Sequence, residues 1–187
     1  AYAHPIEGLC AVIDLDREEV LRVDDYGVAE IPMAERNYAA KFRDNFRDDI
    51  RPLEIIQPQG PSFTVEGQQV HWQKWRFRVG FNAREGLTLH AITYEDGGRE
   101  RSVMHRAALS EMVVPYAHPG GGHFRKNAFD VGEYGFGVLA NSLTLGCDCL
   151  GAIRYFDGWL ADSKGDPYRI ENAICLHEED HGILWKH

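Results

Sequence analysis

The sequence has few basic residues relative to its acidic ones. Its 187 residues include 20 Lys and Arg against 29 Asp and Glu, which gives a formal net charge of -9 at pH 7. A surface that binds phosphates needs a basic face, so this balance argues against a nucleic-acid partner. Long apolar runs are missing as well: no stretch approaches the ~18 residues of a membrane span, so we expect a soluble protein without a membrane partner. No targeting segment is visible at Ala1, which leaves the compartment open and favours the cytoplasm.

Cysteine is also scarce, with Cys10, Cys147, Cys149 and Cys175 the four in the chain. The Cys147-Asp-Cys149 spacing is too tight for an ordinary zinc knuckle, which has two to four residues between its ligands. Spacing alone leaves two possibilities open: one disulfide between Cys175 and either Cys147 or Cys149, or four thiols.

Alternating apolar and polar residues are plentiful, and this period-two pattern is typical of half-buried strands. Residues 10–15 and 19–23 predict a hairpin that must belong to a larger unit, because two strands alone are marginal. The polar segment 31–52 is either a short helix or an extended linker. Further strands are expected over 75–81, 87–94, 101–107, 111–115, within 137–156, and over 168–176. Tight turns such as Gly97-Gly98 join them, so we predict a mainly β fold with an antiparallel sandwich.

One segment, His177-Glu178-Glu179-Asp180-His181, fits the H-E-x-x-H pattern of zinc hydrolases, with His187 where a third ligand would lie. That chemistry needs both histidines on one face of a helix and Glu178 as general base. Gly182 weakens a helix, and the residues before His177 favour a strand. We therefore favour a polar surface segment with solvated histidines and keep a zinc hydrolase as an alternative.

The stretch from Lys126 to Tyr134 places Asp130 between Phe129 and Val131, with Gly132 next. Asp close before Gly is usually a turn residue. An acidic residue between apolar neighbours is alternatively a buried general base. Local chemistry favours the turn and does not exclude the base.

Several motifs, in order along the chain, resemble those of copper amine oxidases. They lie at 4–9, 56–63, 72–75, 79–86, 111–116, 129–134, 140–143, 145–151 and 175–180. The resemblance implies that 1–30 is the end of a small α+β domain, 31–52 a linker, and 53–187 the first part of the large catalytic β-sandwich domain.

Site roles follow from this resemblance by position. Asp130 corresponds to the base that removes a proton from the amine substrate, and Tyr116 to the tyrosine that hydrogen-bonds the topaquinone cofactor. Ala128 takes the place of the channel gate, often aromatic in relatives, and Phe129 lies beside it. Cys149 and Cys175 correspond to the family disulfide.

The family's cofactor tyrosine, in an Asn-Tyr-Asp/Glu motif, and its copper-binding His-x-His pair have no counterpart in these 187 residues. No metal ligands are therefore expected in this chain. The resemblance implies an amine oxidase acting on a small primary amine only in complex with a partner chain that carries topaquinone and copper, in a dimer of multi-chain protomers. A non-catalytic scaffold subunit is the alternative.

Overall fold

A computed structural model describes residues 7–27, 30, 40–121, 124–179 and 181–182. The chain divides into two compact units, residues 1–52 with 113–128, and residues 53–112 with 129–187. None of the helices in the described ranges is long and apolar enough to cross a membrane.

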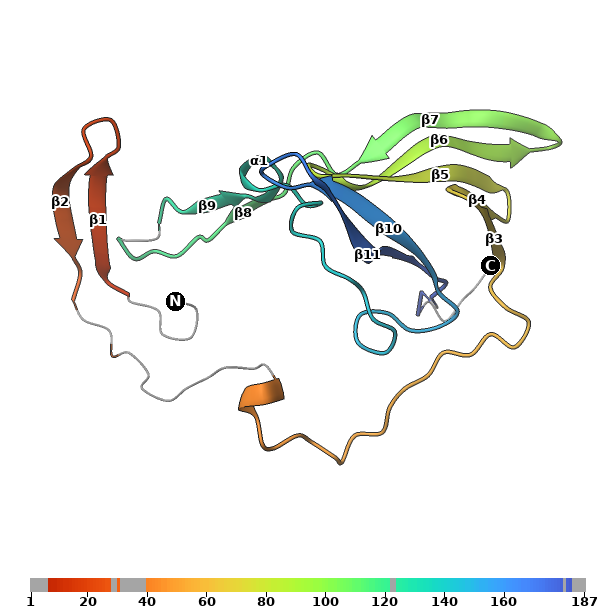
Figure 1. The fold of residues 1–187 in the computed structure, drawn as a ribbon, viewed down its shortest axis with the longest axis horizontal. Coiled ribbons are helices and arrows are strands. Elements are labelled where there is room, and N and C mark those ends of the chain that lie inside the picture. Colours follow the sequence, from red (N-terminus) through yellow and green to blue (C-terminus); the bar gives the residue numbers. More distant parts are fainter. Residues whose placement is uncertain (1–6, 28–29, 31–39, 122–123, 180, 183–187) are drawn as a thin grey trace. The chain divides into compact units, whose positions relative to one another are not determined.

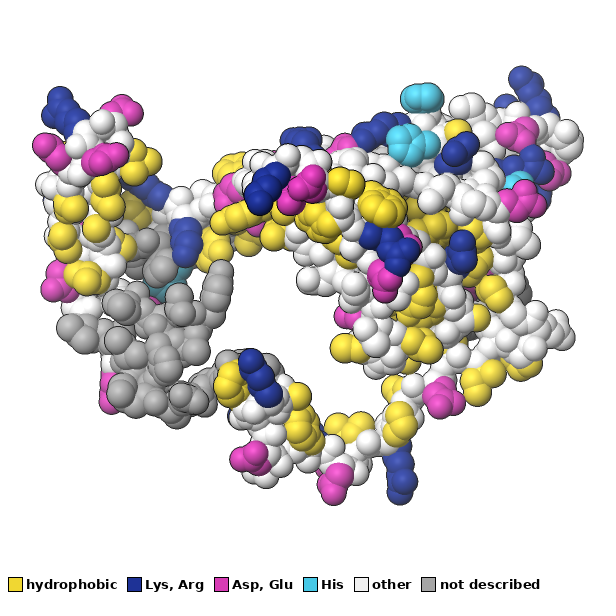
Figure 2. Space-filling view, in the orientation of Figure 1, with side chains coloured by type: hydrophobic (Ala, Val, Ile, Leu, Met, Phe, Trp, Pro, Cys, Tyr) yellow, Lys and Arg dark blue, Asp and Glu magenta, His cyan; other side chains and the backbone are white. Residues whose placement is uncertain are grey.

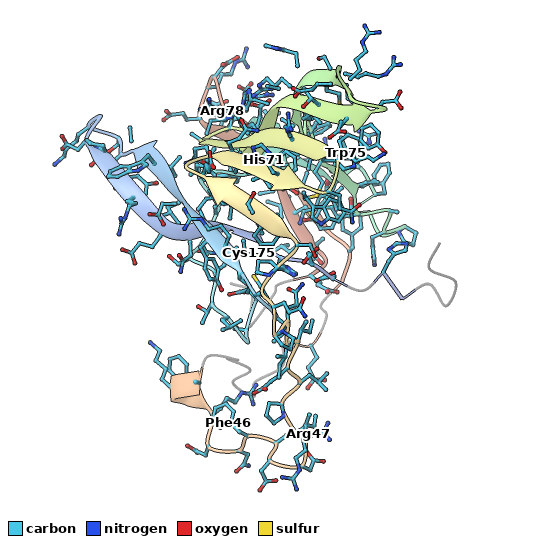
Figure 3. All side chains as sticks on the ribbon, turned by 90° about the vertical axis from the view of Figure 1, so that its right-hand side faces the viewer. Phe46, Arg47, His71, Trp75, Arg78 and Cys175 are labelled. Atoms are coloured by element: carbon cyan, nitrogen blue, oxygen red, sulfur yellow. The ribbon has the colours of Figure 1, made fainter. Side chains whose placement is uncertain are left out.

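The first unit contains an antiparallel hairpin of β1 (Leu9–Asp14) and β2 (Glu19–Asp25), as the alternation predicted (Figure 1). Its turn is fixed by Asp14, whose Oδ1 accepts hydrogen bonds from the Asp16 and Arg17 amides at 3.0 and 3.1 Å. Apolar side chains of this hairpin are exposed, and Figure 2 shows them among the charged ones. Later in the sequence of this unit, the described residues form the single-turn η1 (Ala40–Phe42), which is followed by an irregular stretch with Phe46 and Arg47 (Figure 3).

The second unit is built on a five-stranded antiparallel sheet in which each strand pairs with the next in sequence. Its strands are β3 (Phe63–Glu66), β4 (Gln69–Trp72), β5 (Trp75–Asn82), β6 (Gly86–Asp96) and β7 (Arg99–Ala108). Gly97 and Gly98, with φ of 58° and 83°, form the two-residue turn between β6 and β7, where positive φ favours glycine. Across β5 and β6, the rings of Trp75 and Tyr94 meet edge-on with centroids 4.8 Å apart. Figure 3 labels Trp75 on β5 and His71 on β4.

A second layer, the hairpin of β10 (Arg154–Ala161) and β11 (Pro167–Leu176), packs against this sheet. Every second residue of β10 from Phe156 to Leu160 is buried, as period two requires. The buried cluster between the layers joins Phe63, Val70, Val79, Phe156 and Ile174. Gly158 of β10 allows this approach, since a Cβ there would lie 2.6 Å from the Phe81 ring. The predicted mainly β, antiparallel fold is confirmed, with the two layers packed as a sandwich.

The prediction of strands from 137 onward was wrong for 137–153. That segment is made of turns with an isolated bridge between Leu145 and Cys149, and β10 begins only at Arg154. The backbone explains the difference, because Gly146 and Gly151 adopt φ of 84° and 103°, outside the strand region.

The segment after β11 is held to the sheet by the Glu178 carboxylate. It accepts hydrogen bonds from the Gln57 Nε2 (2.6 Å), the Ser62 amide (2.8 Å) and the Trp72 Nε1 (2.9 Å). These donors, the Ser62 amide first, lower the pKa of Glu178 to about 2. Glu178 thus joins the end of β11 to β4 and to the segment before β3.

Replacing Glu178 with Gln should destabilise the fold and remove part of its sensitivity to acid. Because the pKa of Glu178 is lowered, its stabilisation is present above the ordinary value of 4.5 and is lost as the pH falls toward about 2. Urea unfolding between pH 2 and 7 should therefore show a smaller loss of stability for E178Q than for the wild type. The control is E179Q, because the Glu179 side chain is 71% exposed. Identical pH profiles for E178Q and the wild type would contradict this account.

Candidate active site

Asp130 is the first residue of α1 (Asp130–Glu133), a single helical turn that follows β9 (Asn127–Phe129). β9 pairs with β8 (Val113–Pro115), which lies shortly after the long strand β7 (Figure 1). The backbone at Asp130 therefore forms a turn, which is the interpretation that the local sequence favoured over a buried base. A turn and a base are compatible, since the carboxylate can project from the turn.

Four consecutive backbone amides of this turn donate hydrogen bonds. The Asp130 amide donates to the Met112 carbonyl at 3.1 Å, and the Phe129 amide to the Glu133 Oε1 at 3.0 Å. The next two amides both donate to one side chain: Val131 to the Glu111 Oε1 at 2.8 Å, and Gly132 to the Glu111 Oε2 at 3.1 Å. Consecutive amides from 129 to 132 thus all have acceptors, which fixes the position of Asp130.

The Asp130 side chain is half-buried, and its two apolar neighbours differ. Val131 is 2% exposed and packs inward, whereas Phe129 is 47% exposed. Within the described residues, no hydrogen bond or ion pair is seen at the Asp130 carboxylate. The arrangement is therefore a fixed backbone carrying a carboxylate that remains available to a ligand.

Tyr116 and Ala128 belong to the first unit. The Tyr116 amide donates to the Lys126 carbonyl at 3.0 Å, and the Lys126 Nζ lies 4.7 Å from the centre of the Tyr116 ring. Tyr116 is 51% exposed, and Ala128 is half-buried on β9. Tyr116 is thus a surface residue of its unit, not a core tyrosine.

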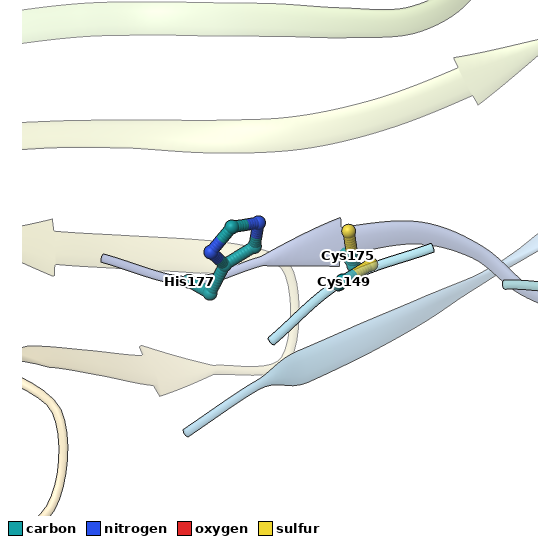
Figure 4. A group of neighbouring side chains, drawn as sticks. All are labelled: Cys149, Cys175 and His177. Carbon is teal, nitrogen blue, oxygen red and sulfur yellow. The ribbon is translucent and has the colours of Figure 1, made fainter. Parts of the chain in front are cut away.

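Cys149, Cys175 and His177 lie together at the end of β11, with their sulfur and nitrogen donor atoms within 4.8 Å of one another (Figure 4). All four cysteines are thiols in the structure, and Cys149 is buried. Burial, and then the neighbouring Cys149, raise the pKa of Cys175 to about 11. Two thiols and an imidazole could hold a soft cation such as zinc, but a closed structural zinc site has four ligands. Adjacent sulfurs equally suit a disulfide.

The H-E-x-x-H segment does not form the arrangement that zinc hydrolysis needs. Residues 177–179 follow β11 without entering a helix, and His181 is exposed. Glu178 is occupied by its three hydrogen-bond donors. Asp180 and His187 lie outside the described residues. His177 instead faces the two cysteines.

Sequence reasoning missed Glu111 as a residue of this site. It was included in a predicted strand at 111–115 and in the family motif at 111–116 without a role of its own, whereas the strand begins at Val113 and Glu111 precedes it. Its partners Val131 and Gly132 lie 20 and 21 positions later in the sequence. No local pattern signals such a contact.

Comparison with known proteins shows which family this chain resembles. Residues 64–187 match the model of the copper amine oxidase enzyme domain. The whole chain aligns at 55% identity with a primary amine oxidase of Arthrobacter sp. (strain P1), of which it covers 29%, and at 51% with a histamine oxidase of Arthrobacter globiformis, of which it covers 27%. The chain thus spans less than a third of these relatives.

A solved structure agrees with this match. The copper-containing benzylamine oxidase of Hansenula polymorpha superimposes with a TM-score of 0.69 at 39% identity, over 96% of this chain and 29% of that one. The fold, the motifs and the sequence identity all agree: the chain belongs to the copper amine oxidase family.

Proposed function

We propose that this chain is a subunit or fragment of an oxidase that converts a primary amine, O2 and water to an aldehyde, ammonia and hydrogen peroxide. Asp130 is the base. The observation that carries this proposal is the Asp130 turn, in which the amides of 129–132 all have acceptors while the Asp130 carboxylate has no partner among the described residues. A general base must be held at a fixed position with its own oxygen atoms free to accept a proton.

In this proposal Asp130 takes a proton from the carbon that bears the amine nitrogen of the substrate. Its half-buried position beside the buried Val131 limits competition from water. Topaquinone, when bound, supplies the group that accepts electrons from the substrate, and copper supports their transfer to oxygen. Tyr116 would donate or accept a hydrogen bond at a quinone oxygen, and its exposed position in its own unit suits a residue that meets a ligand.

Ala128 and Phe129 would line the path of the amine. Ala128 is small and half-buried on β9, and Phe129 presents an exposed ring next to the base. An apolar wall of this kind suits the carbon chain of an amine, and the small residue at 128 favours a wide entrance.

Quinone and copper come from another chain in this proposal, and the protomers that result pair as a dimer. The metal-binding donor atoms that cluster among the described residues do not fit the family's copper site. The cluster at Cys149, Cys175 and His177 offers two thiols and one imidazole, whereas the family's His-x-His pair offers copper imidazoles. A scaffold subunit without a catalytic role is the second candidate.

Replacing Asp130 with Asn or Ala should leave the quinone formed and abolish its reduction by the amine. Loss of a general base typically costs a factor of 10²–10⁴, so we expect a fall of about that size in kcat/KM of the assembled oxidase. Amine-dependent peroxide release measures the loss of turnover, and anaerobic bleaching of the quinone measures the loss of its reduction by the amine. D96N, at a surface ion pair with Arg101, is the control. Retained turnover in D130N would remove Asp130 from the role, and a wild-type assembly that releases no peroxide would favour the scaffold.

We also propose that Cys149 and Cys175 form a disulfide under oxidising conditions. Closing the loop between them should add about 3–4 kcal/mol to the free energy of unfolding. The pKa of Cys175 is raised to about 11, so its reactive thiolate is scarce near neutral pH. The thiolate becomes more abundant as the pH rises, and the bond should therefore form faster at pH 9 than at pH 7. Alkylation and peptide mapping should find this bond in C147S and lose it in C149S. A bond from Cys147 to Cys175 would contradict the pairing.

A further inference from the structure

The turn that carries Asp130 begins without a local cap. The first amides of a helix have no partner within the helix, and a polar side chain at the preceding residue usually accepts from one of them. Here the preceding residue is Phe129, which cannot do so, and no side chain there makes a cap hydrogen bond. The amides of Val131 and Gly132 therefore need an acceptor from elsewhere.

Glu111 is that acceptor. Its Oε1 accepts from the Val131 amide at 2.8 Å and from the Met112 amide at 3.0 Å, and its Oε2 accepts from the Gly132 amide at 3.1 Å. The close approach uses the glycine, since a Cβ on Gly132 would lie 3.1 Å from the same Oε2. Glu111 also precedes Met112, whose carbonyl accepts from the Asp130 amide at 3.1 Å. Residues 111 and 112 thus hold three consecutive amides of the turn.

Without Glu111, the Asp130 carboxylate is an acceptor that lies only one and two residues before these amides in the sequence. An Asp side chain at the start of a helical turn readily bends back to the amide two or three residues later. For Asp130 the first such amide is that of Gly132, the one that Glu111 occupies. In the structure the Asp130 carboxylate makes no hydrogen bond within the described residues.

We propose that Glu111 is a positioning residue for the reaction. It occupies the amides of Val131 and Gly132, holds the turn in place and keeps the Asp130 carboxylate from being used as a helix cap. This inference rests on the proposed role of Asp130 as the base. It assigns Glu111 no contact with the substrate.

The test compares E111A and E111Q with the wild type and D130N in the assembled oxidase. E111A should lower kcat by about tenfold to a hundredfold with KM little changed, since a misplacement of about 1 Å can cost a hundredfold. E111Q should fall between E111A and the wild type, because its amide oxygen still accepts from an amide. Hydrogen exchange of a peptide covering 129–134 should be faster in E111A, with E111Q again intermediate. In the E111A and D130N double variant, the rate should be no lower than in D130N alone.

E85A is the matched control, because Glu85 is a hydrogen-bonded carboxylate of the same unit, paired with Arg106 and Asn82. It should lower thermal stability and leave kcat and the exchange of 129–134 unchanged. If E111A and E111Q both have the kcat of the wild type, the inference about Glu111 is overturned, and the role of Asp130 as the base is unaffected. An active D130N overturns the base and the role of Glu111 with it, and the exchange data then report only a structural anchor. If E111A does not fold, the ratio of kcat in E111Q to kcat in the wild type decides the test alone.

Discussion

The hydrogen bonds from the Val131 and Gly132 amides to Glu111 are the contact on which the candidate site depends. A four-residue helical turn with no cap of its own is not stable in isolation, because few internal hydrogen bonds offset the entropy of fixing it. Glu111 comes shortly after β7, an edge strand of the five-stranded sheet, so the turn is tied to a rigid element of its own unit. Functional groups held by such elements are placed more accurately than groups on free loops.

Carboxylates have two different uses in this unit. Glu111 and Glu178 both accept hydrogen bonds from amides or side chains far away in the sequence, and each joins two segments of the backbone. Asp130 is half-buried and lacks such partners among the described residues. The contrast distinguishes acidic residues that stabilise the fold from one that is available for chemistry. In the H-E-x-x-H segment, the same contrast applies to Glu178, whose carboxylate already accepts three hydrogen bonds and so lacks the open position of a general base.

Much of the fold could be predicted because its information is local. Period-two alternation identified β5, turn residues bounded β6, β7 and β11, and the Gly97-Gly98 pair located a hairpin turn. The segment 137–153 was predicted incorrectly because its apolar residues resemble strands, while Gly146 and Gly151 take positive φ. The Glu111 anchor could not be predicted, since a hydrogen bond across 20 residues leaves no pattern in either segment. The roles of Asp130, Tyr116 and Ala128 came from resemblance alone and remain proposals.

The chain belongs to the copper amine oxidase family and spans less than a third of the length of its relatives. The central question is therefore which chain carries the quinone and the copper. Native mass spectrometry of the protein purified from its source, with copper analysis and quinone staining of the separated chains, addresses it most directly. The account predicts this chain in a complex with another chain that carries both quinone and copper. A monodisperse free monomer of this chain, with neither quinone nor copper in the purified sample, would contradict it.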